Sequence, residues 1–431
     1  MSSGLSQKSQ QNVVQPDGAR GAGNGDILER PVCLITHEFF PAHGGIATFS
    51  EEIARAGAGL GYNIEVWAQE NGAGERRWPF PVRRLPVRGT HGFWELARLA
   101  RELIRSRRSL RNATVYMPEP APLLAMMPLQ FFAGFRPKRL VVTFHGSEIL
   151  RFYRNPFYRV LTRRLIRNAS RVSVLSRFTR DLLYGCFPDA AGKTIITPGA
   201  VRSGLNAGRG GRDDGAGAPA EMPAPVEAAP GKLVVLTVGR LHPRKGQLHA
   251  LRALQALPED LRGNIEYWVV GRSSNGAGAA YEQELRATAA KDAALAVRFL
   301  GEVPDAALGG IYGRADVFAM TSINYRQSVE GFGLVYLEAS AHGLPIVAHD
   351  VGGVGEAVIN EKTGFVVAPP PPGSGDVSAL TSVFQTLLCD GALRKRMGAA
   401  GREHAQLNNW RDSAKKLFAP LTGVTTAPWA A

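Results

Sequence analysis

The chain has 431 residues, about three times the ~150 usual for one domain, so two domains are expected. Apolar residues make up 45% of it and charged residues 20%, a composition that supports sizeable cores and excludes a wholly disordered, collagen-like or disulfide-stapled protein. The formal net charge is +14, and residues 1–200 carry nearly all of the excess, with 28 Lys and Arg against 15 Asp and Glu, compared with 23 against 22 in residues 201–431.

The basic excess is sharpest from Arg76 to Arg180, where 23 basic residues face 4 acidic ones. Such a field predicts an anionic partner: nucleic acid, an anionic membrane surface or a phosphorylated substrate. The alternative is a solvated, arginine-rich surface with no partner.

In chain order, residues 1–29 are rich in Gln, Ser, Gly and Asn and predict a disordered tail. From Pro31 onward, β-branched runs alternate with amphipathic stretches, a pattern typical of a parallel sheet covered by helices. A helix is expected at Ile46–Leu60, and strands at Val32–Thr36, Ile64–Trp67, Thr114–Tyr116, Leu140–Phe144, Val172–Leu175 and Thr194–Ile196.

The most apolar stretch runs from Met117 to Phe135, and four residues within it, Pro118, Glu119, Pro120 and Pro122, interrupt it early. A spanning helix needs ~20 mostly apolar residues, so this segment is no good candidate for one. A position on a bilayer surface, beside the arginines, remains open.

Residues 203–231 are almost wholly Gly, Ala, Pro, Asp and Glu and predict a flexible linker between a first domain at 30–202 and a second at 232–405. The second domain repeats the alternating pattern. Strands are expected at Leu233–Val238, Tyr267–Val270, Val297–Leu300, Val317–Met320, Ile346–Ala348 and Phe365–Val367, with helices at Pro304–Tyr312 and Gly333–Ala341. The fold class is therefore α/β, two doubly wound parallel-sheet domains facing across a cleft, with chemistry at the carboxyl ends of the strands.

Two loops of the first domain can carry chemistry. Gly44 and Gly45 lie between the first strand and its helix, where uncovered N–H groups attract anions, although the pair also suits a plain tight turn. The second loop carries His145 at the end of a strand. The competing interpretation is that Ser147 or Glu148 caps the next helix while His145 only packs.

The loop Val238–Gly246 closes the first strand of the second domain. Arg240 and Lys245, on its two limbs and with Gly239 at its start, can clamp a diphosphate, because Arg offers a planar fork and Lys a point charge. For Arg244, between them, a solvent-facing position is the alternative.

The segment from Glu330 to Glu338 has the sharpest pattern. Its glycines, Gly331 and Gly333, precede a helix whose free N–H groups can receive phosphate. The two glutamates need not face the same way, so they are poor candidates for an acid/base pair. Both can accept hydroxyl hydrogen bonds from one polyol ligand, unless they are surface residues by chance.

Several motifs are absent. The glycine-rich loop at Asp350–Glu356 lacks the third glycine of a dinucleotide fingerprint, and no G-x-x-x-x-G-K-[ST], H-E-x-x-H, G-x-S-x-G or D-x-D occurs. Cys33, Cys186 and Cys389 form no C-x-x-C pair, which fits a reducing compartment. A phosphate site without a metal ion is the expectation.

Together these segments resemble the retaining glycosyltransferases of family 4 (glycosyl transferases group 1), which adopt the GT-B architecture. The resemblance runs from Pro31 to about Phe418 and is strongest from Gly239 to Gly364. There V-G-R-x-x-x-x-K-G, E-G-F-G-L-V-Y-L-E-A and G-L-P-I-V-A occur in the family's order. It implies an acceptor-side first domain, a nucleotide-sugar-binding second domain, and a C-terminal segment, 406–431, that returns to the first.

The resemblance also implies roles for the candidate residues. Arg240 and Lys245 would neutralise the donor diphosphate, Glu330 would bind the hydroxyls of the transferred sugar, and His145 would contact that sugar near the reacting carbon. Glu338 would bind the ribose. The backbone contacts to donor phosphate, base and acceptor would come from Gly331, Phe332, Gly333, Leu334, Gly239, Gly301, Val303, Gly44 and Gly45.

The implied function is metal-independent transfer of a hexose from a GDP- or UDP-linked donor to a lipid-linked, glycan or phosphorylated acceptor, in cell-envelope polysaccharide or glycolipid synthesis. No cofactor, no metal and no nucleic acid partner is expected. A cytoplasmic protein, peripheral on the inner face of an anionic plasma membrane, fits the basic first domain.

Three points remain open. An epimerase or hydrolase of the same architecture is the alternative enzyme. A basic nucleic-acid-binding protein is disfavoured because no binding module or interleaved aromatic platform is present. Thr197-Pro198-Gly199-Ala200 stands where the family often has Asn-Gly entering the linker, which affects hinge geometry rather than donor chemistry.

Overall fold

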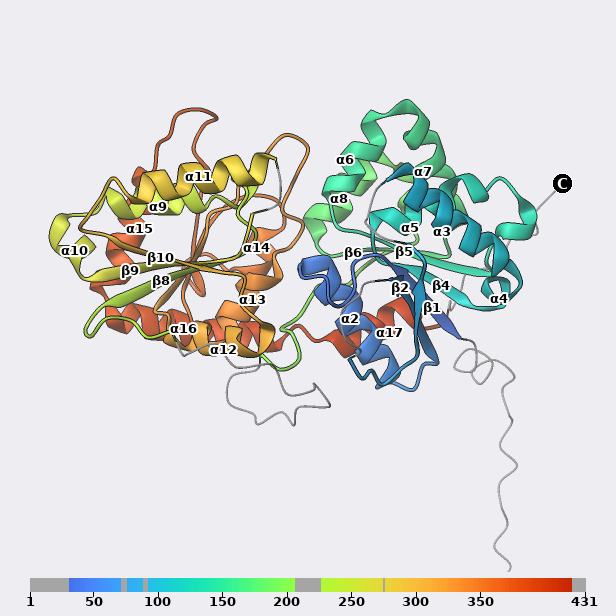
Figure 1. The fold of residues 1–431 in the computed structure, drawn as a ribbon, viewed down its shortest axis with the longest axis horizontal. Helices are drawn as coiled ribbons and strands as arrows, with labels where there is room; N and C mark the ends of the chain where they lie inside the picture. The colour runs from blue at the N-terminus through green and yellow to red at the C-terminus, as the bar shows by residue number, and fades with distance from the viewer. Residues whose placement is uncertain (1–30, 71–75, 88–91, 206–225, 274–275, 421–431) are drawn as a thin grey trace, which may run out of the picture.

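The structure, a computed structural model, describes residues 31–70, 76–87, 92–205, 226–273 and 276–420. Within them the chain forms two α/β domains, each built on one parallel sheet (Figure 1). The predicted fold class is confirmed. The predicted tail 1–29, and residues 206–225 of the predicted linker, lie outside the described residues.

The first sheet has seven parallel strands in the order β3-β2-β1-β4-β5-β6-β7. Their bounds are β1 Val32–Thr36, β2 Ile64–Gln69, β3 Val82–Leu85, β4 Thr114–Met117, β5 Arg139–Phe144, β6 Arg171–Val174 and β7 Thr194–Ile196. The expected strands of this half are present, with ends that differ by at most two residues. The sequence analysis missed β3, because this short edge strand has two arginines among its four residues and no clear apolar alternation.

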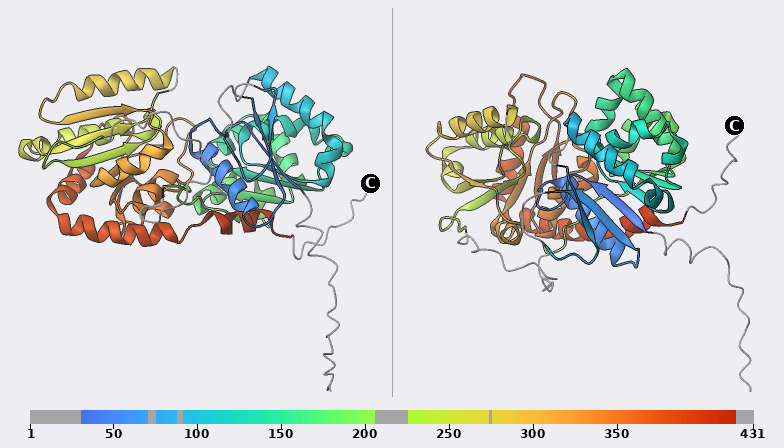
Figure 2. Two further views of the ribbon diagram at one scale, coloured as in Figure 1. Left: turned by 60° about the horizontal axis from the view of Figure 1, so that its bottom comes forward. Right: turned by 45° about the vertical axis from the view of Figure 1, so that its right-hand side comes forward.

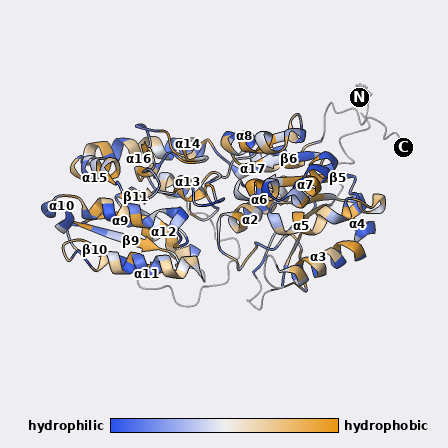
Figure 3. Cartoon of the chain, turned by 90° about the horizontal axis from the view of Figure 1, so that it is seen from above, coloured by the Kyte–Doolittle hydropathy of each residue, from blue (hydrophilic) through white to orange (hydrophobic). Residues whose placement is uncertain are grey.

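Helices cover both faces of the first sheet. Their bounds are α2 Gly45–Ala58, α3 Phe93–Arg105, α4 Arg107–Asn112, α5 Pro120–Leu129, α6 Ser147–Arg154, α7 Pro156–Asn168 and α8 Arg177–Cys186, with short 3₁₀ turns at Ala133–Phe135 and Pro188–Ala190. Alternate residues of β1 enter the two apolar cores on either side of the sheet. One core contains residues of α3, α5 and α7, and the other contains residues of α2. Figure 3 shows hydrophilic and hydrophobic residues interleaved along these helices.

The apolar segment from Met117 to Phe135 does not lie on a surface as a whole. Its helix, α5, packs between α3 and α7, and nearly all of its side chains are buried. The alternative of a bilayer position is therefore wrong for α5, and the exposed residues of the segment are Pro128 and those at 131–134, which include Phe131 and Phe132. No helix in the described ranges combines the length and the apolar character that crossing a membrane requires.

The second sheet has six parallel strands in the order β10-β9-β8-β11-β12-β13. The strands are β8 Leu233–Val238, β9 Ile265–Val270, β10 Ala296–Gly301, β11 Val317–Met320, β12 Ile346–His349 and β13 Gly364–Val367. The helices are α9 Gln247–Gln255, α10 Glu259–Gly263, α11 Ala277–Ala289, α12 Asp305–Arg314, α13 Leu334–Ala341, α14 Val354–Ala357, α15 Ser378–Cys389 and α16 Gly391–Gln406, with a 3₁₀ turn at Pro243–Lys245.

The last helix, α17 (Trp410–Phe418), leaves the second domain and packs against α2 of the first (Figure 2, left). The Trp410 ring lies edge-on to Phe49, with 5.5 Å between centroids, and its indole N–H donates to the Val201 carbonyl over 2.9 Å. The guanidinium of Arg171 donates to the Leu417 carbonyl over 3.1 Å, at the end of the helix. Cations at a helix C-terminus also interact favourably with its dipole.

Both ends of the predicted linker pack against the domains. The Ser203 hydroxyl donates to the Glu52 carboxylate over 2.6 Å, and Leu205 is buried. At the other end, Glu227 pairs with Arg314 over 2.7 Å. Residues near both ends of the predicted linker therefore make side-chain contacts with the domains.

The strand orders of the two sheets indicate where ligands bind. In the first sheet the direction of winding reverses between β1 and β4, and in the second between β8 and β11. Loops that leave the carboxyl ends of two such strands diverge to opposite faces, and ligands of doubly wound sheets bind in the crevice between them.

Candidate functional site

The second-domain site forms where the loops after β8 and β11 meet. The β8 loop is tied to the β11 loop by the Thr321 hydroxyl, which donates to the Gly246 carbonyl over 2.7 Å, and by the Ile323 N–H, which donates to the Arg244 carbonyl over 2.8 Å. Gly246 has φ 72°, and a Cβ there would lie 1.8 Å from the Thr321 carbonyl oxygen. Only glycine permits this approach, so the glycine of the K-G motif fixes the position of Lys245.

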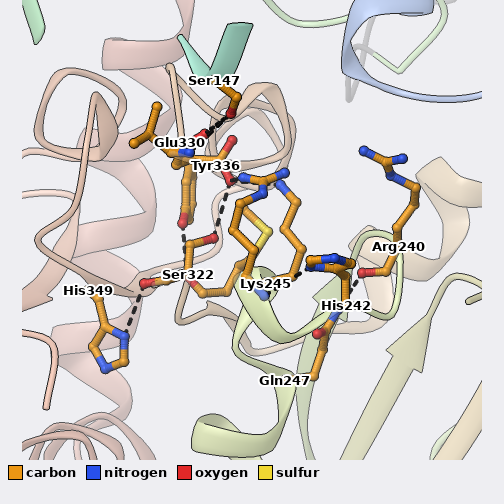
Figure 4. Close-up of polar contacts among 12 residues, drawn as sticks. Ser147, Arg240, His242, Lys245, Gln247, Ser322, Glu330, Tyr336 and His349 are labelled. Atoms are coloured by element: carbon orange, nitrogen blue, oxygen red, sulfur yellow. Dashed lines mark hydrogen bonds and ion pairs between the residues drawn. The ribbon is translucent and has the colours of Figure 1, made fainter. Parts of the chain in front are cut away.

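A buried carboxylate lies at the centre of this junction (Figure 4). Oε2 of Glu330 accepts from Arg244 Nη1 at 2.6 Å, from Lys245 Nζ at 2.7 Å and from the Ser322 hydroxyl at 3.2 Å. Among the described residues, Oε1 has no hydrogen-bond donor. One oxygen therefore holds the cations, and the other remains available as an acceptor.

The charges of this cluster are strongly coupled. Burial disfavours the ionised form of Glu330, but Lys245 and Arg244 outweigh it and lower the pKa of the carboxyl to about 2. Burial lowers the pKa of Lys245 to about 8, although the Glu330 carboxylate favours its charged form. At neutral pH the cluster of Glu330, Lys245 and Arg244 carries a net positive charge beside the start of α13.

The two predicted diphosphate ligands do not lie together. Lys245 belongs to the cluster, whereas Arg240 is exposed and its guanidinium is set apart from Glu330 (Figure 4). Within the described residues the Arg240 side chain has no hydrogen bond or ion pair. Arg244, for which the sequence left a solvent-facing position open, is instead mostly buried against Glu330. The signal for Arg244 was its place beside Lys245 in a loop that must turn inward at Gly246.

The predicted phosphate-binding backbone begins α13. Gly333 precedes the helix with φ 86°, and no side chain caps its first turn. Gly331 and Phe332 are buried, and Leu334 opens the helix. The first N–H groups of α13 thus have no side-chain cap, and uncapped N–H groups at a helix N-terminus can bind an anion.

Glu338, the predicted ribose ligand, lies deeper. Its carboxylate accepts from the Tyr312 hydroxyl over 3.1 Å and faces the Arg202 guanidinium over 3.6 Å. Burial raises the pKa of Glu338, although Arg202 opposes this shift. Arg202 also pairs with Asp305 at the start of α12 and so connects the end of the first domain to the second. The sequence analysis missed Arg202, which lies in an irregular segment without a motif.

Gly301 and Val303, the predicted base-contacting positions, lie at the carboxyl end of β10. Gly301 ends the strand with φ 67°, and its carbonyl accepts from the Gly271 N–H over 2.7 Å. Val303 packs partly against the core just before α12. Both are on the same edge of the sheet as Lys245 and Glu330.

His145 and Gly44 come from the first domain's own carboxyl edge. His145 Nε2 lies 2.6 Å from the Pro118 carbonyl, and its ring meets Phe49 edge-on. The ring is therefore held by the first domain, while the His145 backbone faces Gly331. At Gly45 a Cβ would have no neighbour within 4 Å, so this loop borders open space.

The segment Val329–Gly331 is held between the two domains. The Val329 N–H donates to the Ser147 hydroxyl over 3.0 Å, and the Ser176 hydroxyl donates to the Gly331 carbonyl over 2.7 Å. A Cβ at Gly331 would lie 1.9 Å from the His145 carbonyl oxygen. The contact that brings His145 to the Glu330 segment thus depends on the absence of a side chain at Gly331.

Glu38 is an acidic residue that the sequence analysis did not single out. Burial and the carboxylate of Glu119 raise the pKa of Glu38 to about 7, against the opposing charge of Arg240. Glu119 itself accepts the His37 N–H over 2.5 Å, which joins the loops after β4 and β1 at the first switch point. Glu38 thus lies within electrostatic reach both of a buried carboxylate of its own domain and of Arg240 in the second domain.

The side chains that could bind a metal ion are those of His, Cys, Asp and Glu. Across the ranges that the structure describes, no three His, Cys, Asp or Glu side chains are grouped so that they could hold a metal ion. The charged groups gathered at the second-domain site are two cations and one carboxylate.

Comparison with known proteins shows which family the sequence of this chain is similar to. Residues 220–404 match the family described as Glycosyl transferases group 1, and residues 44–199 match the Glycosyl transferase 4-like domain. Over 406 residues the chain is 32% identical to the GDP-mannose-dependent alpha-(1-6)-phosphatidylinositol monomannoside mannosyltransferase of Mycolicibacterium smegmatis, covering 90% of this chain and 98% of that protein.

Two further similarities are partial or structural. The D-inositol 3-phosphate glycosyltransferase of Corynebacterium diphtheriae is 37% identical over 185 residues, which cover 43% of this chain and 41% of that protein. Sucrose-phosphate synthase of Thermosynechococcus elongatus has the same fold, with a TM-score of 0.68 at 22% identity over 89% of this chain and 96% of that one.

A methyl group at Gly331 tests the contact between the domains. Gly331→Ala must separate the segment from the His145 carbonyl by about 1 Å or more, and displacements of that size at a reacting centre can lower turnover about 100-fold. We expect normal circular dichroism, a larger radius of gyration in solution scattering, and that loss of turnover. Gly313→Ala, on α12 with no neighbour within 4 Å of its Cβ, is the control. Wild-type turnover in Gly331→Ala would contradict the closed arrangement.

Proposed function

The chain belongs to the glycosyl transferases of group 1, and from this premise we propose that it moves mannose from GDP-mannose to a lipid-linked or phosphorylated acceptor. It is a nucleotide-sugar-dependent hexosyltransferase of the GT-B type. Mannose and guanosine are proposed because the M. smegmatis relative, matched over 98% of its length, is named for that donor. A UDP-linked hexose is the alternative donor.

The observation that carries the proposal is the positive cluster at the start of α13. A donor diphosphate brings two negative charges, and Lys245 Nζ, the uncapped N–H groups of α13 and the exposed Arg240 are the groups suited to receive them. Glu330 Oε1 is suited to accept a hydroxyl of the transferred sugar. Arg240 would move toward the diphosphate when it binds, because an exposed arginine is free to change rotamer.

The chemistry follows from where charge develops. Breaking the bond between the anomeric carbon and the diphosphate leaves negative charge on the departing oxygen and positive charge on the sugar. Preorganised cations and helix N–H groups stabilise that oxygen without reorganising, which is the largest source of catalysis in such sites. The acceptor attacks from the face that the diphosphate leaves, so configuration is retained, and a departing phosphate oxygen takes the acceptor's proton.

We further propose that no metal ion takes part. The role that Mg²⁺ or Mn²⁺ plays on a diphosphate, neutralising charge, falls here to Lys245, Arg240 and the helix terminus. Contact between the domains at Gly331 would exclude water from the sugar and limit hydrolysis of the donor.

The first domain is suited to a peripheral place on the inner face of an anionic membrane. At the start of α3, Phe93 and Trp94 are 74% and 72% exposed. Helices α3 and α4 carry six arginines against two glutamates. Exposed aromatics beside basic residues combine apolar insertion with attraction to anionic lipid, worth ~1 kcal/mol per Lys or Arg near the surface.

Transfer itself is tested with a donor panel. We expect GDP-mannose to bind and to label an acceptor extracted from envelope lipid, with unchanged rate in excess EDTA. Slow release of free mannose without acceptor is compatible with transfer. If adding an acceptor does not reduce the release of free mannose, the protein is a hydrolase. If the nucleotide-bound sugar is converted into a different sugar, the protein is an epimerase. Strict dependence on added metal would contradict the metal-free site.

Lys245 gives donor binding a pH dependence. Its pKa of about 8 means that it loses its charge as the pH rises through that value, so the Kd for GDP should increase by up to about tenfold between pH 7 and pH 9. Calorimetric titration checks this. Lys245→Arg stays charged over that range and should remove the increase, whatever its own affinity. An equal increase in both proteins would assign the effect to another group.

Membrane attachment is tested by flotation with phosphatidylglycerol vesicles. Phe93→Ser/Trp94→Ser should lose most of the bound fraction, and 1 M salt should lower it in the wild type. Leu407→Ser, an equally exposed apolar residue on the second domain, is the control. Equal binding to phosphatidylcholine vesicles at all salt concentrations would contradict the proposal.

A further inference from the structure

A cavity of about 410 Å³ opens between the two domains, and no residue of the Glu330 cluster is among those that line it. One wall is the hairpin of α6 and α7 in the first domain, and the other is a tight turn of the second domain at 325–328. The lining residues are Leu150, Tyr153, Arg154, Arg159, Arg326 and Gln327.

The side chains that line the cavity carry positive charge, and no acidic side chain among them balances it. Three of its six lining residues are arginines and none is acidic. Across the described residues, the guanidinium groups of Arg154, Arg159 and Arg326 have no ion pair. By contrast, Arg163 and Arg167, further along α7, share Asp189 at 3.2 and 2.8 Å. The arginines without a carboxylate partner in this hairpin include those that face the cavity.

Aromatic rings hold two of these arginines in place. The Arg159 guanidinium lies over the Tyr153 ring at 5.5 Å, and the Arg326 guanidinium lies over the Tyr325 ring at 5.4 Å. Stacking on a ring occupies the face of a guanidinium and leaves its N–H edge for an anion. Two planar forks are thus available without a large loss of side-chain freedom.

The backbone of the turn at 325–328 also indicates that the cavity is a binding site. Tyr325 and Ser328 exchange two hydrogen bonds, of 3.2 and 2.9 Å, and Arg326 at the tip has φ 53°. A residue other than glycine in the left-handed region costs free energy, and such residues concentrate at binding and catalytic sites. The strained residue here is one whose side chain lines the cavity.

Both walls of the cavity are continuous along the chain with segments that lie at Glu330. Helix α6 begins at Ser147, which contacts Val329 directly before Glu330. Arg154 lies seven residues further on, about 10 Å along the helix. The turn at 325–328 ends two residues before Glu330. Arg326 lies four residues before Glu330, so their Cα atoms are at most about 14 Å apart, a span that two side chains and a small ligand between them can bridge.

We propose that this cavity binds the phosphate group of the acceptor, so that the enzyme selects a phosphorylated polyol, either a free phosphate monoester or the phosphodiester of a lipid headgroup. The inference rests on the proposed transferase function and identifies the acceptor class for it. Arginine forks bind phosphate oxygens in pairs. Because Arg154 and Arg159 come from one domain and Arg326 from the other, the acceptor phosphate also holds the two domains together.

Inorganic phosphate is the probe, measured by calorimetry on the full chain saturated with GDP so that the diphosphate site is filled. The wild type should bind one phosphate. Arg154→Ala/Arg326→Ala should weaken that binding by at least about tenfold, since two guanidinium groups that donate charged hydrogen bonds to the phosphate are removed. Arg151→Ala, an exposed arginine one turn earlier on α6 that does not line the cavity, should bind phosphate as the wild type does.

The source of the phosphate is distinguished by competition. Displacement by inositol 1-phosphate identifies a free monoester, and displacement only by vesicles containing phosphatidylinositol in phosphatidylcholine identifies a lipid headgroup. Either result supports the proposal. Absence of phosphate binding to the GDP-saturated wild type, or equal binding to the double variant, overturns it. Failure of GDP to bind at all would instead overturn the proposed function.

Discussion

Two cations and one carboxylate share a mostly buried junction at the carboxyl edge of the second sheet, and the arrangement of the site depends on their pairing. Arg244 and Lys245 would each lose several kcal/mol if buried without a counter-charge, so Glu330 must accept both. In return they keep Glu330 ionised. The same pairing fixes the β8 loop against the β11 loop, where the switch in strand order creates a crevice.

This pairing also sets what the site can bind. The Glu330, Arg244 and Lys245 cluster has a net positive charge, and it lies at a helix start whose N–H groups have no side-chain cap. Positive charge and uncapped N–H groups together favour an anionic ligand over a neutral one, as the proposed donor diphosphate requires. Because the adjoining segment through Gly331 also touches His145, the charged cluster of the second domain and the first domain are connected by one short stretch of backbone.

Much of this could be predicted from the sequence, and the exceptions have physical causes. The parallel strands are recognisable because they are buried, β-branched runs, and the motifs follow them at the strand ends. The edge strand β3 was missed because it is half exposed and carries two arginines. A surface position for the apolar segment after β4 stayed open at the level of sequence, because no local pattern reveals that α5 packs between α3 and α7.

Within the site, the sequence located the loops but not every contact. Spacing singled out Lys245 and Glu330, yet their mutual ion pair and the part of Arg244 in it depend on how two distant loops meet. Arg202 and Arg326 lie in irregular segments without a motif. Only the three-dimensional structure places Arg202 beside Glu338 and Arg326 in the wall of the cavity between the domains.

The most direct measurement is a crystal structure with GDP-mannose bound. The diphosphate should lie within hydrogen-bond distance of Lys245 Nζ and of the first N–H groups of α13, with the mannose beside Glu330 Oε1 and Arg240 turned toward the phosphates. A donor bound elsewhere, or one whose phosphates are held by a metal ion while Lys245 remains turned to Glu330 alone, would contradict this account.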